Sequence, residues 1–393
     1  MSFINIISSI GNNKSVYPLL VRDCGIEIPS KVALTYNQNL KDSKQMAYNA
    51  TRERLIDEYG TSAIWLGGIP VMNSICDFGI KKLGFNPNVN VSLYKETKEQ
   101  GIKYNIEKFK EKAPDAVKDL EKALKNKAKY QKLQAGKFVL STSVPIALMG
   151  FILPKLNFKL TERIRNKQEK RNISKSSENV SFKGVASTLS NMSTVNKMAV
   201  TDGGLTVGRV ATARNKYEKM EMGFKMSMMM FLNFVFPIYL AKGLDNLSKK
   251  VFGLNVDLDP KLLGKNSEKL IDMELPKESI IDFLDKKPNS EFAKLCEEYC
   301  GVKYLKNRVR DPRVFVDTEK VEKFKNEIQK YSEALKKSKN PQKYAKKALR
   351  VKSANILANI GISSFLLAAA LPELTFFLRK KVTGSDAEPG LMS

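Results

Sequence analysis

The chain has 393 residues, of which 42% are hydrophobic and 27% are charged, with 67 Lys and Arg against 41 Asp and Glu and no histidine. This composition is too apolar for a disordered tail and too charged for a chain made mostly of membrane spans, so apolar and charged segments must be separated along it. The lack of histidine excludes Ser-His-Asp triads and imidazole-ligated zinc sites. Since no nucleophile and base can be paired, we predict a non-enzymatic protein without a cofactor.

The N-terminal segment, residues 1–19, has no basic residue before Lys14 and therefore lacks the start of a secretory signal. Residues 23–28 (DCGIEI) follow it and read as a small polar turn. Asp23 and Gly25 are candidates for a backbone nest that binds an anion, although a purely structural turn explains the same residues. We predict a protein that is not secreted.

Four segments lack charge over nearly the length of a bilayer crossing: residues 59–76, 138–154, 226–241 and 353–372. A charge at mid-membrane costs about 2.5 to 3.5 kcal/mol, so sharp lysine borders such as those here are typical of crossings. Each segment also holds or ends at a proline, which kinks or ends a helix. We predict membrane-embedded helices, with the buried central helices of a soluble all-α protein as the alternative.

Two carboxylates lie at the edges of these segments. Asp77 follows the first segment directly, and Glu373 follows Pro372 in the fourth. Ionisable groups at membrane depth are commonly functional, so both are candidates for a role in transport or gating.

Lysine-rich amphipathic helices are predicted between the apolar segments, because apolar residues recur there at helical spacing. In the first half, Pro114 is placed to open the second of two such helices. The apolar positions are Ile102, Ile106, Phe109, Val117, Leu120 and Leu124, and later Val321, Phe324, Ile328, Tyr331 and Leu335. We expect these stripes to pack on the protein itself; lying on an anionic membrane surface is the alternative.

The four cysteines are too few and too scattered for a disulfide framework, so reduced thiols are expected. Cys296 and Cys300 fall on one face of a helix that Ser290 can cap and Gly301 can end. Further ligands at suitable spacing are lacking, and we predict buried side chains and no metal site.

A polar stretch rich in Ser and Asn, residues 171–200, is predicted to be a linker. Residues 202–207 (DGGLTV) follow it as a second small turn, in which Asp202 and Gly204 are candidates for anion binding. The run does not end in the Gly-Lys-Ser/Thr of a phosphate-binding P-loop, so a structural turn is again the simpler explanation.

Self-comparison indicates an internal duplication. LPKLNFKL at 153–160 recurs as LPELTFFL at 371–378, and Pro70 corresponds to Pro237. The repeat units are 20–170 and 201–381, with two apolar segments in each, an insertion at 256–318 in the second and a flexible tail at 382–393. Because each unit contributes an even number of apolar segments, the two units would enter the membrane in the same orientation.

The fold class predicted is therefore all-α: an internally duplicated helical protein with about four membrane-embedded apolar helices and long lysine-rich helices. Its function is predicted to be a membrane-associated scaffold or a small permease of unknown substrate. The alternative is a soluble all-α module that binds an anionic partner such as lipid headgroups, RNA or an acidic protein. The partners expected are anionic membrane lipids, and a second copy or another protein could also bind.

Nucleic acid is not an expected partner, because 54 lysines against 13 arginines is the wrong balance for a nucleic-acid reader. The connectors 81–137 and 242–352 hold 42 of the 67 Lys and Arg. With four crossings they share a side of the membrane, and this basic excess favours the cytoplasmic side.

Overall fold

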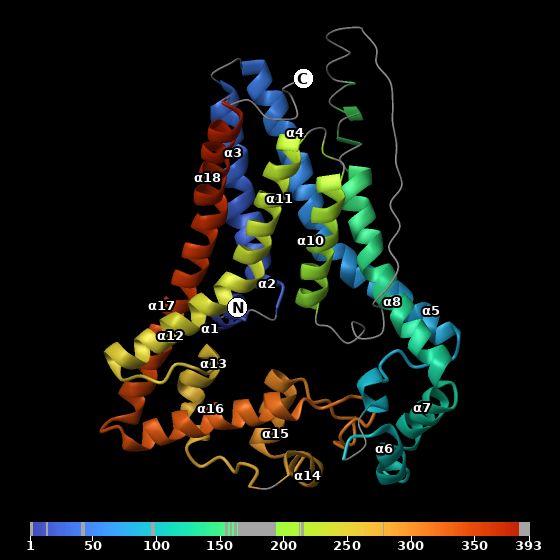
Figure 1. Cartoon of the computed structure of the whole chain (residues 1–393). Helices are drawn as coiled ribbons and strands as arrows, with labels where there is room; N and C mark the ends of the chain where they lie inside the picture. Colours follow the sequence, from blue (N-terminus) through green and yellow to red (C-terminus); the bar gives the residue numbers. More distant parts are fainter. Residues whose placement is uncertain are drawn as a thin grey trace.

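The computed structural model describes residues 3–12, 15–40, 44–95, 99–153, 156–157, 159–160, 163, 194–211, 213, 216–277 and 279–384. Throughout these residues the chain forms helices, turns and loops, and the only β-type pairing is an isolated bridge between Tyr304 and Arg310. The predicted all-α class is confirmed. The molecule consists of a tall helix bundle standing on a broader base (Figure 1).

The bundle is built from long helices, most of which contain a π-helical turn (η) that joins two α-helical parts. Its elements are α2 (Tyr17–Arg22), η1 (Asp23–Glu27), α3 (Ile28–Leu40), α4 (Lys44–Ala63), η2 (Ile64–Gly68), α5 (Ile69–Lys82), α8 (Lys127–Ala147), η4 (Leu148–Ile152), α10 (Thr194–Ala211), α11 (Lys216–Met230), η5 (Phe231–Val235), α12 (Phe236–Phe252), α17 (Pro341–Phe365), η8 (Leu366–Ala370) and α18 (Leu371–Thr383).

The base contains shorter helices and α16. Its elements are the 3₁₀ helices η3 (Val91–Tyr94) and η6 (Lys265–Leu270), the π turn η7 (Cys296–Cys300), and the α-helices α6 (Ile102–Phe109), α7 (Pro114–Lys125), α13 (Pro260–Leu263), α14 (Ile280–Lys286), α15 (Glu291–Leu295) and α16 (Thr318–Lys337). Helix α1 (Phe3–Gly11) contacts α13 where the bundle meets the base. The connectors 81–137 and 242–352 thus lie at one end of the bundle (Figure 1).

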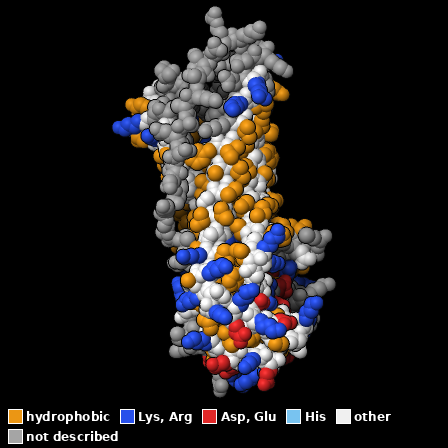
Figure 2. All heavy atoms as spheres, turned by 90° about the vertical axis from the view of Figure 1, so that its right-hand side faces the viewer, with side chains coloured by type: hydrophobic (Ala, Val, Ile, Leu, Met, Phe, Trp, Pro, Cys, Tyr) orange, Lys and Arg blue, Asp and Glu red, His pale blue; other side chains and the backbone are white. Residues whose placement is uncertain are grey.

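Four helices are long and apolar enough to cross a membrane: Ala47–Lys82, Lys127–Ile152, Lys219–Phe252 and Pro341–Thr383. They contain the four apolar segments of the sequence. In the most apolar stretch of each, no more than 39% of the residues are buried. Large side chains such as Phe78, Tyr239 and Phe365 are more than half exposed on the outside of the bundle. Figure 2 shows this apolar surface along one side of the column, with charged side chains gathered on the base.

Each π turn of the bundle ends two residues before a proline. The prolines are Pro29, Pro70, Pro154, Pro237 and Pro372 in sequence order. Proline has no N–H and its ring collides with the carbonyl four residues earlier, so a wider turn relieves the clash without ending the helix. In η5, the N–H of Phe236 accordingly donates to the carbonyl of Phe231, five residues back. At Pro29, Pro70, Pro237 and Pro372, all within the described residues, the helix continues through the proline.

The two small turns predicted from the sequence are wrong. Residues 23–28 form η1 and the first residue of α3, and residues 202–207 lie inside α10. The bundle therefore has a further helix in each predicted unit. The misleading signal was glycine: Gly25 is exposed in η1, whereas Gly204 lies inside α10 where Ile146 of α8 packs against it.

Helices α8 and α10 run in the same direction and pack closely at glycines. A Cβ added at Gly204 would lie 2.6 Å from Cδ1 of Ile146, and one at Gly208 would lie 3.6 Å from the ring of Phe151. Because successive contacts lie at higher residue numbers on both helices, the two helices are parallel. Small residues four apart are a common means of close helix packing in membranes.

The base has a large apolar core in which the predicted amphipathic stripes are buried. Val321, Phe324, Ile328, Tyr331 and Leu335 of α16 all belong to it. The stripes of α6 and α7 likewise pack into apolar clusters of the base. The prediction that these helices pack on their own protein is confirmed.

Ser290 caps α15 by accepting from the N–H of Ala293, and Gly301 ends η7 in the left-handed conformation. The two cysteines between them, Cys296 and Cys300, are buried thiols. The helix predicted for Cys296 and Cys300 is confirmed, with its last turn widened to a π turn.

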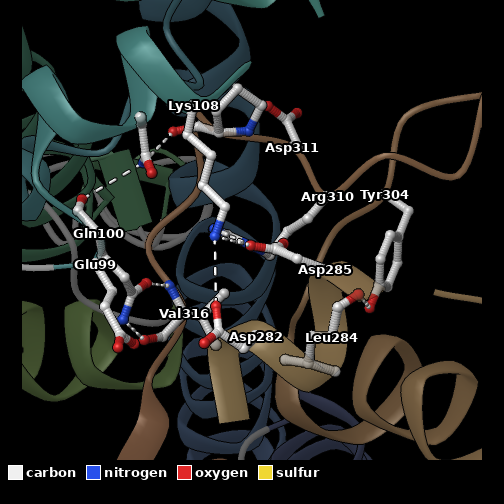
Figure 3. Close-up of polar contacts among 12 residues, drawn as sticks. Glu99, Gln100, Lys108, Asp282, Leu284, Asp285, Tyr304, Arg310, Asp311 and Val316 are labelled. Carbon is white, nitrogen blue, oxygen red and sulfur yellow. Dashed lines mark hydrogen bonds and ion pairs between the residues drawn. The ribbon is translucent and has the colours of Figure 1, made fainter. Parts of the chain in front are cut away.

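Polar contacts join the base halves from the two predicted units (Figure 3). The amide of Gln100 donates to the carbonyl of Val316 at 2.8 Å and its oxygen accepts from the Val316 N–H at 2.7 Å. Asp285 pairs with Arg310 at 2.7 Å and with Lys108 at 2.9 Å. The insertion 256–318 thus binds back onto the first unit.

The structure describes only parts of three segments predicted from the sequence. The linker 171–200 lies outside the described residues except for 194–200, which belong to α10. Of the tail 382–393, only the last residues of α18 and the turn at Gly384 are described. The segment 1–19 contains α1 and the start of α2.

Candidate functional site: a charged cavity in the bundle

The bundle encloses a cavity of about 410 Å³ in its half remote from the base. Its lining residues come from η1, α3, α4, η2, α10, α11, η5 and α18, and one wall is apolar, with Trp65, Leu205 and several methionines. The charged side chains that line it are Asp23, Glu27, Lys31, Arg54, Asp57, Glu58, Asp202, Arg209, Glu221, Lys225 and Arg379. This is an unusual density of charge for the inside of a bundle whose outer face is apolar.

Most of these charges are neutralised in pairs. Lys31 pairs with Glu27 and lies 3.7 Å from Glu58, which also accepts from Arg54 at 2.8 Å. The ion pairs link α3 to α4, so they fix the packing of the cavity wall as well as its charge.

Two further pairs link other helices around the cavity. Arg209 of α10 lies 3.6 Å from Asp57 of α4. Arg379 of α18 binds Glu221 of α11 through two nitrogens, with Nε 2.8 Å from Oε2. An arginine fork that meets a carboxylate in this way sets its orientation as well as its charge.

Three charged groups that line the cavity have no ion pair within 4 Å among the described residues: Asp23, Asp202 and Lys225. Asp23 is 8% exposed, and its Oδ1 has no hydrogen-bond partner. Two other buried oxygens on the lining also lack a partner, Oγ1 of Thr61 and Oδ1 of Asn233. Buried polar groups are rarely left unbonded in proteins, so this concentration at one cavity indicates a ligand or ordered water.

Arg22, which precedes Asp23 in the sequence, fixes the position of α2 against η5. Its guanidinium donates to the carbonyls of Leu232 and Asn233, at 3.5 and 3.2 Å. Both carbonyls lose their helical partner at η5, because Phe236 bonds to Phe231 and Pro237 has no N–H. Arg22 satisfies these free acceptors and so holds α2 against the kink of α11 and α12.

The structure brings two of the six predicted site residues into the cavity, Asp23 and Asp202. They lie on helices rather than in anion-binding turns. Gly25 is exposed in η1, and Gly204 serves the close packing of α10 on α8.

The two predicted edge carboxylates lie outside the cavity. Asp77 forms an ion pair with Lys137 of α8 near the base, and Glu373 is exposed in the first turn of α18. Neither joins the charged cluster.

Sequence reasoning missed the basic residues of the site and most of its acids. A signal was present in three pairs of opposite charge four residues apart: Glu27 with Lys31, Arg54 with Glu58, and Glu221 with Lys225. Such pairs are also common on solvated helix faces, so the spacing alone does not indicate a buried site. Two of the pairs, Arg54 with Glu58 and Glu221 with Lys225, directly precede apolar segments.

The site can bind and neutralise a small charged molecule. The part of the chain that the structure describes has no group of Cys, Asp and Glu arranged to hold a metal ion. No protein-family model matches the chain, and neither curated proteins nor solved structures include a significant match to it. Fold and cavity thus define an all-α protein with four helices of membrane-crossing length, three of which contribute side chains to the lining of a charged cavity.

Proposed function

We propose that the protein is a membrane-embedded permease for a small charged solute. The observation that carries the proposal is the charged cavity inside a bundle with an apolar exterior. Charged groups in a membrane are costly and are usually found where a solute or ion passes. A scaffold would need the apolar exterior but not a cavity lined by eleven charged residues. The proposal assigns no enzymatic reaction and no cofactor.

The internal duplication belongs to this proposal as the origin of the bundle. It is supported by the π turns, since η2 and η5 lie 167 positions apart, as do Pro70 and Pro237. Likewise η4 and η8 lie 218 positions apart, as do the Leu-Pro blocks that follow them. Parallel repeats that face one another across a midplane site are a common plan among transporters.

We place the base on the cytoplasmic side, because its two connectors carry most of the basic residues. Lysines such as Lys82 and Lys242, which lie over the rings of Phe78 and Tyr239, are positioned to meet anionic lipid headgroups. The remaining alternative, a soluble module with an anionic partner, would leave the exposed apolar face of the bundle without a role.

Thiol accessibility in sealed membranes tests the proposal. In a Cys24→Ser, Cys76→Ser background, Ser62→Cys places a thiol on the cavity wall, and Val71→Cys places one on the outer face, where Val71 is 57% exposed. A small charged methanethiosulfonate should label the cavity thiol in membranes and the outer thiol only after detergent is added.

Either thiol can contradict the proposal. Rapid labelling of the Val71→Cys thiol without detergent would show that the bundle faces water and is not embedded. A Ser62→Cys thiol that stays unlabelled in membranes and reacts in detergent would show a cavity closed to solutes. Retention in the membrane pellet through carbonate washing provides an independent check on embedding.

A further inference from the structure

The cavity has two levels that differ in charge. Along the continuous helix of α11 and η5, Lys225 and Asn233 are eight residues apart, and along α10, Asp202 and Arg209 are seven apart. At 1.5 Å per residue, these pairs are separated by about 10 to 12 Å along the bundle axis. The ion pairs of Arg209 with Asp57 and of Arg379 with Glu221 lie at the level of Lys225, remote from the base.

The deep level, nearer the base, is rich in unpartnered oxygen atoms. It holds Asp23, Asp202, Thr61 and Asn233, and the carboxylate of Asp23 is both buried and lacks a hydrogen-bond partner at Oδ1. The charges that act on Asp23 are those of Glu27, Arg22, Lys31 and Asp202. An alkylammonium group has three N–H donors, so a cluster of free acceptors with a carboxylate is suited to bind it.

The outer level is basic and reaches the surface. Lys225 has no ion pair within 4 Å among the described residues, and the charges that act on it are the cations Arg54, Lys31 and Arg209 and the single carboxylate of Glu58. The side chains of Arg54 and Arg209 are 26% and 22% exposed. A carboxylate at this level would give Lys225 the partner that the protein does not supply.

We propose that the cavity binds a small zwitterion in one orientation, with its ammonium group on Asp23 and Asp202 and its carboxylate on Lys225. The two levels favour a molecule with separated charges, such as an ω-amino acid or a short peptide, over one whose charges are adjacent. The apolar wall with Trp65 and the methionines would contact the chain between the two charges. This inference deepens the proposed permease function and rests on it for its physiological meaning.

Binding to the purified full-length protein in detergent tests the inference with probes that differ only in charge. The probes are 6-aminohexanoate, 6-aminohexanamide and hexanoate, which are a zwitterion, a cation and an anion of similar length. Calorimetric titration should show that the zwitterion binds at least tenfold more tightly than the other two. A length series of glycine, 4-aminobutyrate, 6-aminohexanoate and glycylglycine should favour the longer members.

Two variants test which charged end of the ligand binds at Asp23 and which binds at Lys225. Asp23→Asn should weaken the zwitterion and the amide at least tenfold and leave hexanoate unchanged. Lys225→Gln should weaken the zwitterion and hexanoate at least tenfold and leave the amide unchanged. Glu373→Gln, which removes an exposed carboxylate outside the cavity, is the matched control and should change none of the three affinities.

Several results would overturn the inference. A cation that binds as tightly as the zwitterion, with no effect of Lys225→Gln, would define a cation site instead. Failure of every zwitterion of the length series to bind wild-type protein at 10 mM would also refute it. Since these measurements need no membrane, they can fail while thiol labelling still supports a water-filled cavity, and the two proposals are thereby tested separately.

Discussion

Asp285 holds two cations at the base, and its removal should destabilise the base far more than removal of its neighbour Asp282. Asp285 is 11% exposed and binds Arg310 through both oxygens, while the Arg310 side chain is fully buried. Asp282 is 45% exposed and lies 3.6 Å from Lys108 (Figure 3). The two carboxylates occupy the same short helix, α14, and are a matched pair.

The magnitude follows from the burial of the partner. In Asp285→Asn, the Arg310 guanidinium stays buried without its counter-charge, which typically costs about 3 to 5 kcal/mol. In Asp282→Asn, an exposed ion pair and a favourable charge in the first turn of a helix are lost, together worth about 1 kcal/mol. Arg310→Met should fall between them, because Asp285 keeps Lys108 at 2.9 Å.

Cysteine protection provides the assay. Hydrogen bonding to Cys300 and burial raise the pKa of the Cys296 thiol, so it stays protonated and inaccessible in the folded base at pH 8. In the full-length protein with Cys24 and Cys76 replaced by serine, alkylation of Cys296 and Cys300 in increasing urea reports unfolding of the base. Equal unfolding midpoints for Asp285→Asn and Asp282→Asn would refute the role assigned to the buried pair.

Two further predictions concern the pairing of α8 and α10. Gly204→Val should destabilise the bundle by about 1 to 3 kcal/mol, because the new side chain would collide with Ile146. Gly203→Val is the control and should cost less, since a Cβ there would make only an ordinary van der Waals contact. Thermal unfolding of the purified protein measures both changes. In sealed vesicles, Leu160→Cys and Asn196→Cys should react with an impermeant maleimide from opposite sides, since the helices are parallel, and labelling from one side would contradict that arrangement.

The helices of the base could be predicted because their apolar spacing is regular. The stripe from Val321 to Leu335 repeats over five positions, and α16 buries all five. Capping signals were equally clear at Ser290 and Gly301, where a hydroxyl acceptor and a left-handed glycine are needed for local reasons. These features depend on short stretches of chain and can therefore be predicted from a single sequence.

The cavity could not be predicted, because its residues meet only after the helices pack. Glu58 belongs to a charged run before the first apolar segment, and Lys225 borders the third, so each looks like a solvated flank. Their burial depends on α3, α10 and α18, which close around them from distant parts of the chain. Asp23 and Asp202 were selected as members of turns, and their actual common feature, facing one cavity, is a tertiary property.

The prolines that seemed to weaken the case for long helices are part of how the site is built. Pro29 follows η1, whose residues include Asp23 and Glu27, and Pro372 lines the cavity directly. At Pro237, the π turn releases two carbonyls that Arg22 binds, and one of them belongs to Asn233, whose side chain faces the cavity. The π turns before Pro29 and Pro237 therefore contain cavity residues, Asp23 and Glu27 in η1 and Asn233 in η5. The prolines that interrupt the regular hydrogen bonding of these helices thus lie close in sequence to polar groups of the cavity.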